Sequence, residues 1–156
     1  MVKGFHHVEV ICEDIEQSKE FFTHVLGGKL LYDACETPPG HLDERVGIPS
    51  AIAKTVVVKM RDSVIELIEY LHPKTKPTGL SAAGIGTLHL AIEVYDIDSE
   101  VEKLRKKGVK FNWPPTLIKK GPDKGWVWCY FKSLDRDQLE LVENRSLRYL
   151  CKIATI

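Results

Sequence analysis

The chain has 156 residues, of which 44% are hydrophobic and 28% are charged, and its 22 Lys and Arg residues balance 22 Asp and Glu residues. This length suits a single domain, and the composition is too apolar for a disordered chain. The zero net charge offers no overall field for nucleic acid or an anionic membrane, and no apolar stretch approaches the ~18 residues of a membrane span. We therefore expect a cytoplasmic protein with neither a nucleic acid nor a membrane as partner.

The first half of the chain predicts a strand, a helix and three further strands. The strands are expected at 5–11, 29–34, 51–60 and 63–70. The helix is amphipathic, with Asp14 as its N-cap and with Gly27 and Gly28 at its end. Only Arg61 and Asp62 separate the last two strands, which predicts a hairpin.

The second half of the chain predicts the same order of elements. The strands are expected at 87–94, 109–112, 126–132 and 138–143. A helix opens at Asp96 and ends at Gly108. This order indicates an α+β protein built from two βαβββ modules.

Short motifs recur between the halves at matching positions. His7 precedes Asp14 by seven residues, and His89 precedes Asp96 by seven. The segment IELIE near the end of the first half corresponds to LELVE near the end of the second. We interpret this as a duplicated unit within one domain, 1–156, in which repeat 1 covers about 5–70 and repeat 2 about 87–144, followed by a C-terminal extension.

Alternation along the strands predicts two histidines and two carboxylates on equivalent polar faces. The valines of the first strand leave His7 on the opposite face, and the apolar residues of the fifth strand do the same for His89. The Ile and Leu residues beside Glu66 and Glu140 place these two carboxylates alike. Because all four recur in register with the duplication, we predict a shared site for a divalent ion: Mn, Fe, Co, Ni or Zn.

Other polar residues leave alternatives open. His6 would replace His7 as a ligand if the strand were shifted by one residue, although the repeat offset favours His7. Two carboxylates share the histidines' faces and are candidates to line the site: Glu9 and Glu93. Two others are predicted to be surface residues: Glu69 and Glu143.

Three aromatic residues alternate along the seventh predicted strand. Trp126, Trp128 and Tyr130 are expected to share one face of the sheet. Core packing is the ordinary role of such a row. If the row lies on the face of the predicted site, it offers an apolar wall for part of a substrate.

The chain resembles the vicinal oxygen chelate superfamily, which includes glyoxalase I, methylmalonyl-CoA epimerase, extradiol dioxygenases and antibiotic-resistance proteins. The resemblance is carried by HVEVICEDIEQSKEFFTHVLGGKL, DSVIELIEYLHP, HLAIEVYDID and YFKSLDRDQLELVE, which extend over nearly the whole chain. It implies curved sheets around a divalent metal held by His7, Glu66, His89 and Glu140. It also implies a homodimer, since family members are often dimers.

The complete set of implied ligands favours the glyoxalase and epimerase branches. Their chemistry suggests that a substrate with two adjacent oxygens binds the metal, which stabilises an enolate or enediolate while a carboxylate moves a proton. Glu140, Glu66 or Glu44 is the expected base. The alternatives are an extradiol dioxygenase and a non-catalytic small-molecule binder of the antibiotic-resistance type.

Overall fold

The computed structural model describes residues 1–37, 46–77, 83–133 and 138–145. The chain divides into two compact units, Met1–Gly79 and Leu80–Ile156. Each unit has a strand, a helix and three strands in sequence order, so the predicted α+β class and the two βαβββ modules are confirmed. One sequence repeat lies in each unit. The expected C-terminal extension begins at the end of the second repeat and falls almost entirely outside the described ranges.

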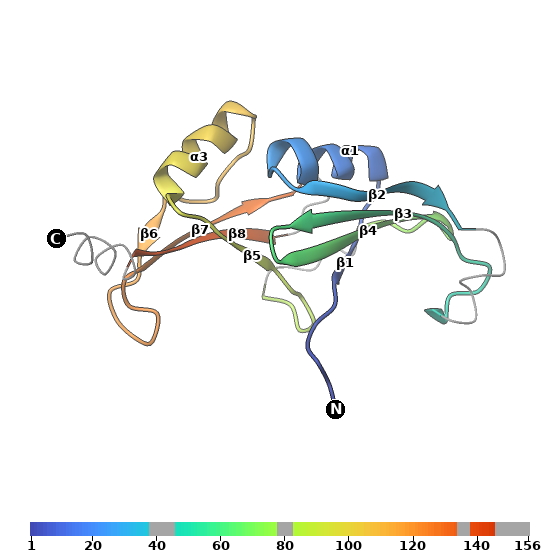
Figure 1. Ribbon diagram of the computed structural model, residues 1–156, viewed down its shortest axis with the longest axis horizontal. Coiled ribbons are helices and arrows are strands. Elements are labelled where there is room, and N and C mark those ends of the chain that lie inside the picture. Colours follow the sequence, from blue (N-terminus) through green and yellow to red (C-terminus); the bar gives the residue numbers. More distant parts are fainter. Residues whose placement is uncertain (38–45, 78–82, 134–137, 146–156) are drawn as a thin grey trace. The chain divides into compact units, whose positions relative to one another are not determined.

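Unit 1 is a four-stranded mixed sheet with a helix on one face (Figure 1). Its elements are β1 (Val8–Ile11), α1 (Ile15–Glu20), the π-helical turn η1 (Phe21–Val25), β2 (Lys29–Glu36), β3 (Ile52–Met60) and β4 (Ser63–His72). The strand order is β1-β4-β3-β2. β1 is parallel to β4, and the other pairs are antiparallel, including the predicted hairpin of β3 and β4.

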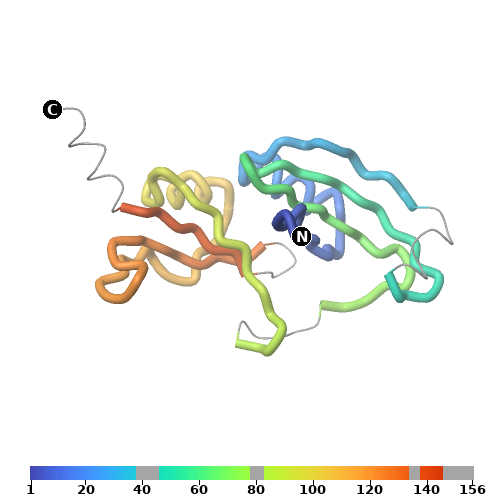
Figure 2. Tube along the Cα trace, turned by 60° about the horizontal axis from the view of Figure 1, so that its bottom comes forward, coloured from blue at the N-terminus to red at the C-terminus, as the bar shows by residue number. Residues whose placement is uncertain are grey.

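Unit 2 repeats this topology. Its elements are β5 (Leu90–Glu93), α3 (Ile97–Lys106), β6 (Thr116–Leu117), β7 (Trp126–Lys132) and β8 (Gln138–Asn144). The strand order is β5-β8-β7-β6, with β5 parallel to β8. Figure 2 shows β8, in red, between the yellow-green β5 and the orange β7. The last strand of each unit is therefore central, and the first strand lies at an edge.

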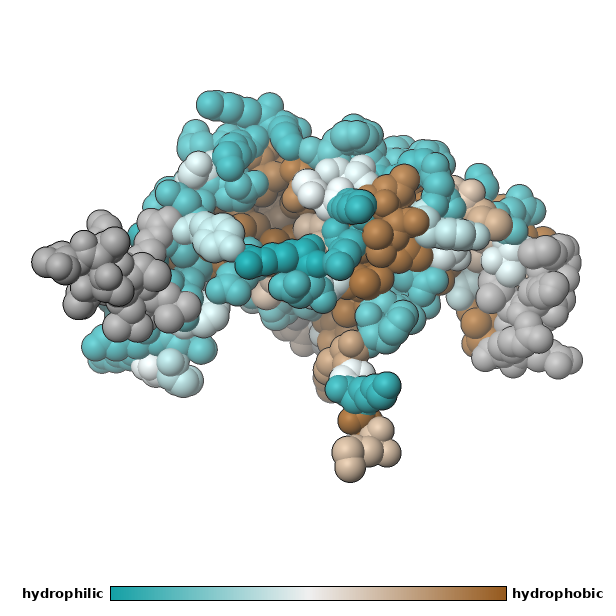
Figure 3. Space-filling view, in the orientation of Figure 1, coloured by the Kyte–Doolittle hydropathy of each residue, from teal (hydrophilic) through white to brown (hydrophobic). Residues whose placement is uncertain are grey.

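Each helix buries its apolar side against its own sheet. In unit 1 the fully buried side chains include Ile15 of α1 and Leu67 of β4, and in unit 2 they include Ile97, Leu104 and Phe131. The outward surfaces of both helices are hydrophilic (Figure 3). No helix in the described parts of the chain is long and apolar enough to cross a membrane.

The strand expected at 109–112 is not formed. Only Phe111 makes an isolated bridge, to Phe131, and the edge strand β6 begins at Thr116. Pro114 and Pro115 lie between these two contacts and have no backbone N–H to donate to a sheet. The interruption of this edge therefore has a local cause in the sequence.

The ends of the helices follow the predicted signals. Asp14 accepts a hydrogen bond from Gln17 N–H at 3.0 Å, and Asp96 accepts one from Ser99 N–H at 3.0 Å.

Gly28 has a second role that its sequence position did not indicate. A Cβ there would come within 2.5 Å of Val58 Cγ1 and 2.7 Å of the Phe22 carbonyl oxygen, so only glycine fits between the helix end and β3.

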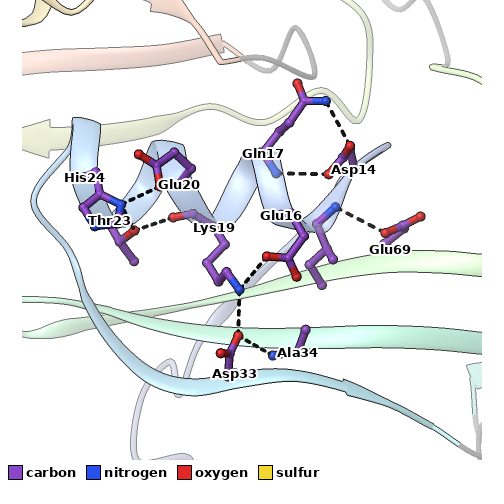
Figure 4. Close-up of polar contacts among 11 residues, drawn as sticks. Asp14, Glu16, Gln17, Lys19, Glu20, Thr23, His24, Asp33, Ala34 and Glu69 are labelled. Atoms are coloured by element: carbon purple, nitrogen blue, oxygen red, sulfur yellow. Dashed lines mark hydrogen bonds and ion pairs between the residues drawn. The ribbon is translucent and has the colours of Figure 1, made fainter.

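The prediction that Glu69 and Glu143 are surface residues is wrong. Both lie on the helix-covered face of the last strand and accept a hydrogen bond from the first helical N–H: Ile15 N to Glu69 at 3.3 Å (Figure 4) and Ile97 N to Glu143 at 3.0 Å. Glu143 is only 2% exposed and also binds Arg145. A negative carboxylate suits this position because the N-terminus of a helix carries partial positive charge.

We predict that Glu143→Gln lowers the free energy of unfolding by about 1 to 3 kcal/mol, because a neutral amide loses the charge-assisted bonds to Ile97 N–H and Arg145. Urea denaturation followed by circular dichroism measures this difference. The control is Glu102→Gln, since the Glu102 side chain is 64% exposed and makes a surface ion pair with Arg105. Equal stabilities of the two variants would contradict a structural role for Glu143.

We predict that Glu69 contributes to the acid dependence of stability. Burial acts to raise the pKa of Glu69, but hydrogen bonds from Lys74, at 2.7 Å, and from Ile15 N–H outweigh it and lower the pKa below its ordinary value. A lowered pKa in the folded state stabilises the protein above the unfolded value of about 4.3, and this stabilisation disappears as the pH falls through the folded pKa. Denaturation at several pH values should therefore show a smaller loss below about pH 4.3 for Glu69→Gln than for the wild type, while Glu102→Gln follows the wild type.

Candidate functional site

In unit 1, a histidine and a glutamate meet on the face of the sheet opposite α1. His7 lies one residue before β1, and the parallel register pairs Glu9 of β1 with Glu66 of β4. His7, Glu9 and Glu66 therefore share a face, as the sequence predicted. The His7 Nε2 atom is 3.0 Å from the Glu66 Oε2 atom, and the two side chains are 38% and 25% exposed.

Unit 2 holds the equivalent pair. His89 lies one residue before β5, and Ala91 of β5 pairs with Glu140 of β8, as Glu9 pairs with Glu66 in unit 1. The His89 Nε2 atom is 3.1 Å from the Glu140 Oε2 atom. The structure thus brings one of the predicted histidines and one of the predicted carboxylates together in each unit.

Each unit supplies two potential metal ligands. Within residues 1–37, 46–77, 83–133 and 138–145, no group of three or more His, Cys, Asp or Glu side chains is gathered in a way that could hold a metal ion. A four-ligand centre that combines the two pairs stays a prediction. Glu44, one of the three expected bases, lies outside the described residues.

His6 contacts the other side of the His7 ring. The two Nδ1 atoms are 2.8 Å apart, and the rings are nearly perpendicular, at 86°. A neutral His7 that donates from Nε2 to Glu66 accepts at Nδ1 from His6. This geometry gives His7 the position beside the carboxylate and His6 a supporting one, which agrees with the preference drawn from the repeat.

A second carboxylate lies next to the unit 1 pair. Partial burial, followed by the nearby Glu66 carboxylate, raises the pKa of Glu9, against an opposing effect of His7. A carboxyl group with a raised pKa is a better proton acceptor near neutral pH than an ordinary one. Glu9 therefore joins the candidate bases, whereas its counterpart in unit 2 is Ala91.

Aromatic side chains adjoin the unit 2 pair. Tyr130 of β7 lies directly across from Glu140, and its ring meets the His89 ring edge to face, with centroids 5.4 Å apart. Trp128 contacts Tyr130 in turn, at 5.2 Å. Trp126, Trp128 and Tyr130 are all half-buried and share this face, as expected. Burial, and then the Glu140 carboxylate, raises the pKa of Tyr130.

The donor atoms of the two pairs fit a divalent transition metal. Imidazole nitrogen and carboxylate oxygen are common ligands of Mn, Fe, Co, Ni and Zn. All four side chains are partly open to solvent, with exposures between 13% and 45%, so each can change partner from the neighbouring residue to an ion. His7 and Glu66, with His89 and Glu140, are the residues of this chain that would hold such an ion.

Comparison with known proteins agrees with this architecture. The model of the Glyoxalase/Bleomycin resistance protein/Dioxygenase superfamily matches residues 6–130. A 2-epi-5-epi-valiolone epimerase from Actinomyces sp. is 34% identical over 141 residues, which are 88% of this chain and 77% of the epimerase. The uncharacterized protein YwkD of Bacillus subtilis is 29% identical over 144 residues, 92% of this chain and 99% of YwkD.

Solved structures share the fold. A glyoxalase family protein from Bacillus cereus superposes with a TM-score of 0.76 at 21% identity, covering 92% of this chain and 95% of that protein. The fosfomycin resistance protein FosX of Listeria monocytogenes, solved with Mn(II) and sulfate, has a TM-score of 0.63 at 14% identity, covering 96% and 99% of the two chains. The family match, the epimerase relative and the duplicated modules lead to one assignment: this chain belongs to the glyoxalase/bleomycin resistance/dioxygenase superfamily, the vicinal oxygen chelate superfamily.

Proposed function

We propose that this protein is a divalent-metal-dependent epimerase or isomerase that moves a proton at a carbon beside a carbonyl group, on a substrate with two adjacent oxygens. The observation that carries the proposal is the repeated His–Glu pair, at 3.0 Å in unit 1 and 3.1 Å in unit 2. The relative named as an epimerase, at 34% identity, supports the epimerase branch over the glyoxalase branch.

Both pairs are proposed to bind one ion together. Two ligands alone bind a divalent ion weakly, whereas two imidazoles and two carboxylates form a site of four protein ligands, to which substrate or water can add. When bound, the ion supplies positive charge beside the adjacent substrate oxygens and so favours loss of the neighbouring proton.

The carboxylates are proposed to move the proton. Glu66 and Glu140 are each held by one histidine, and a carboxylate that exchanges this partner has a free oxygen to accept a proton. Glu9 is not one of the four proposed metal ligands, and its raised pKa suits a base. Return of the proton to the opposite face of the same carbon gives epimerisation. Return to the adjacent carbon gives an isomerisation of the glyoxalase type.

We predict that the purified protein binds one divalent ion per chain and that His7→Ala and His89→Ala each abolish this binding. Elemental analysis after dialysis against Zn, Ni, Co, Mn or Fe(II) measures the content. Melting temperature gives a second readout, because an ion at 100 times its Kd stabilises the folded state by about 2.7 kcal/mol. His6→Ala should keep its ion, as should the control His24→Ala, whose side chain is 74% exposed on η1.

Two ions per chain would contradict a shared site, because each pair would then act alone. Full metal content in either His7→Ala or His89→Ala would contradict it equally. Loss of the ion in His6→Ala with retention in His7→Ala would assign the ligand role to His6.

We predict that the metal-loaded protein incorporates deuterium from deuterated water at the carbon beside the carbonyl of its substrate. Suitable candidates are 2-epi-5-epi-valiolone, 2-methylacyl thioesters and hemithioacetals, followed by NMR. Replacement of the base by Gln should slow incorporation about 100- to 10,000-fold. Glu9→Gln, Glu44→Gln, Glu66→Gln and Glu140→Gln are compared with Glu102→Gln, which lies on the exposed side of α3.

Metal content separates the roles of these carboxylates. A variant that keeps its ion but loses exchange has lost the base, and one that loses both has lost a ligand. A metal-loaded wild type that exchanges none of the candidates would contradict the proposed function. Oxygen consumption with a catechol and ferrous iron would indicate a dioxygenase instead.

A further inference from the structure

The two units surround the same His–Glu pair with different side chains. The residue directly across from Glu66 is Val57, and the one across from Glu140 is Tyr130. Two residues away on the same strands, Thr55 corresponds to Trp128. The His–Glu pair is therefore duplicated, whereas the aromatic pair on the strand next to the carboxylate belongs to unit 2 alone.

The aromatic pair begins at the functional side chains. Tyr130 touches the His89 ring edge to face, at 90°, and Trp128 extends the row away from it. Both residues lie on β7, and the opposite face of this strand is buried in the core by side chains that are at most 2% exposed: Val127, Cys129 and Phe131. This anchoring holds the aromatic rings in place on the same face as His89 and Glu140.

We propose that Trp128 and Tyr130 bind the carbon skeleton of a cyclic substrate and so select ring-shaped hydroxyketones over open-chain ones. This inference rests on the proposed function, which places the two adjacent oxygens of the substrate at the His–Glu residues. The carbons next to those oxygens then lie beside the aromatic pair.

The geometry favours a ring for a physical reason. A saturated ring presents several C–H groups on one rigid face, which can pack flat against an aromatic side chain. A short open chain buries less apolar surface and also loses rotational freedom on binding. A row of half-buried aromatics that starts at the polar pair therefore suits a molecule with oxygens on one edge and a ring behind them.

Two probes with six carbons each test the proposal: 2-hydroxycyclohexanone and the open-chain 4-hydroxy-3-hexanone, which carry the same hydroxyketone group. Ligand-observed NMR titration of the zinc-loaded protein gives a Kd for each, and the ratio of the two is the readout. The wild type should bind the ring compound about tenfold more tightly, and Trp128→Ala should remove most of this preference. Trp128→Phe should keep it, because an aromatic face remains.

The control is Trp113→Ala, since Trp113 is 74% exposed and lies outside the strands. Circular dichroism and melting temperature identify variants that fail to fold. If Trp128→Ala does not fold, Trp128→Leu replaces it, because leucine keeps an apolar side chain but has no aromatic face, and it should also lose the preference. A wild type without ring preference, or a folded Trp128→Ala with the wild-type ratio, would overturn the proposal. Both probes are also followed for deuterium incorporation. A ring preference without deuterium exchange supports this proposal and contradicts only the proposed function. Exchange of both probes, with the same ratio of Kd values in the wild type and in Trp128→Ala, contradicts only this proposal.

Discussion

The site depends on parallel pairing between the first and last strands of each unit. β1 pairs with β4 from Val8 and Ile65 onward, and β5 pairs with β8 from Leu90 and Leu139 onward. This register places the residue before each first strand beside the glutamate of the last strand. A shift of one residue would turn the polar side chains toward the helix. The hydrophobic core thus sets the position of the polar groups.

The same last strands also hold the helices. Three residues beyond each site glutamate, a second glutamate points to the other face and accepts the first N–H of the helix: Glu69 for α1 and Glu143 for α3. Each of these strands therefore carries one carboxylate beside a histidine and a second one that holds the helix. Buried carboxylates need such partners, because an unpaired charge inside a protein is costly.

The sequence was sufficient to predict the duplication, the two modules and the placement of His7 and Glu66, and of His89 and Glu140, on equivalent faces of the sheets, because strand alternation and repeat spacing are local properties. It did not predict the roles of Glu69 and Glu143. Both follow Ile or Val in LIE and LVE and look like ordinary strand-end residues, and only the path of the helix above them reveals the buried N–H groups. The strand expected at 109–112 is reduced to a single bridge because Pro114 and Pro115, which follow it, have no N–H to donate and interrupt the edge of the sheet before Thr116.

The His–Glu pairs and the residues across from them lie on different strands, and this arrangement affects how such a protein can evolve. The histidines and their carboxylates lie on or beside the β1–β4 and β5–β8 pairs, while the residues directly across from the carboxylates, Val57 and Tyr130, lie on β3 and β7. Substitutions on the site-facing side of β7 leave the buried Val127 and Phe131 and the hydrogen-bonded ladder in place. The duplicated architecture thus leaves the half-buried face of β7 free to change its side chains while the buried face of the same strand keeps unit 2 folded.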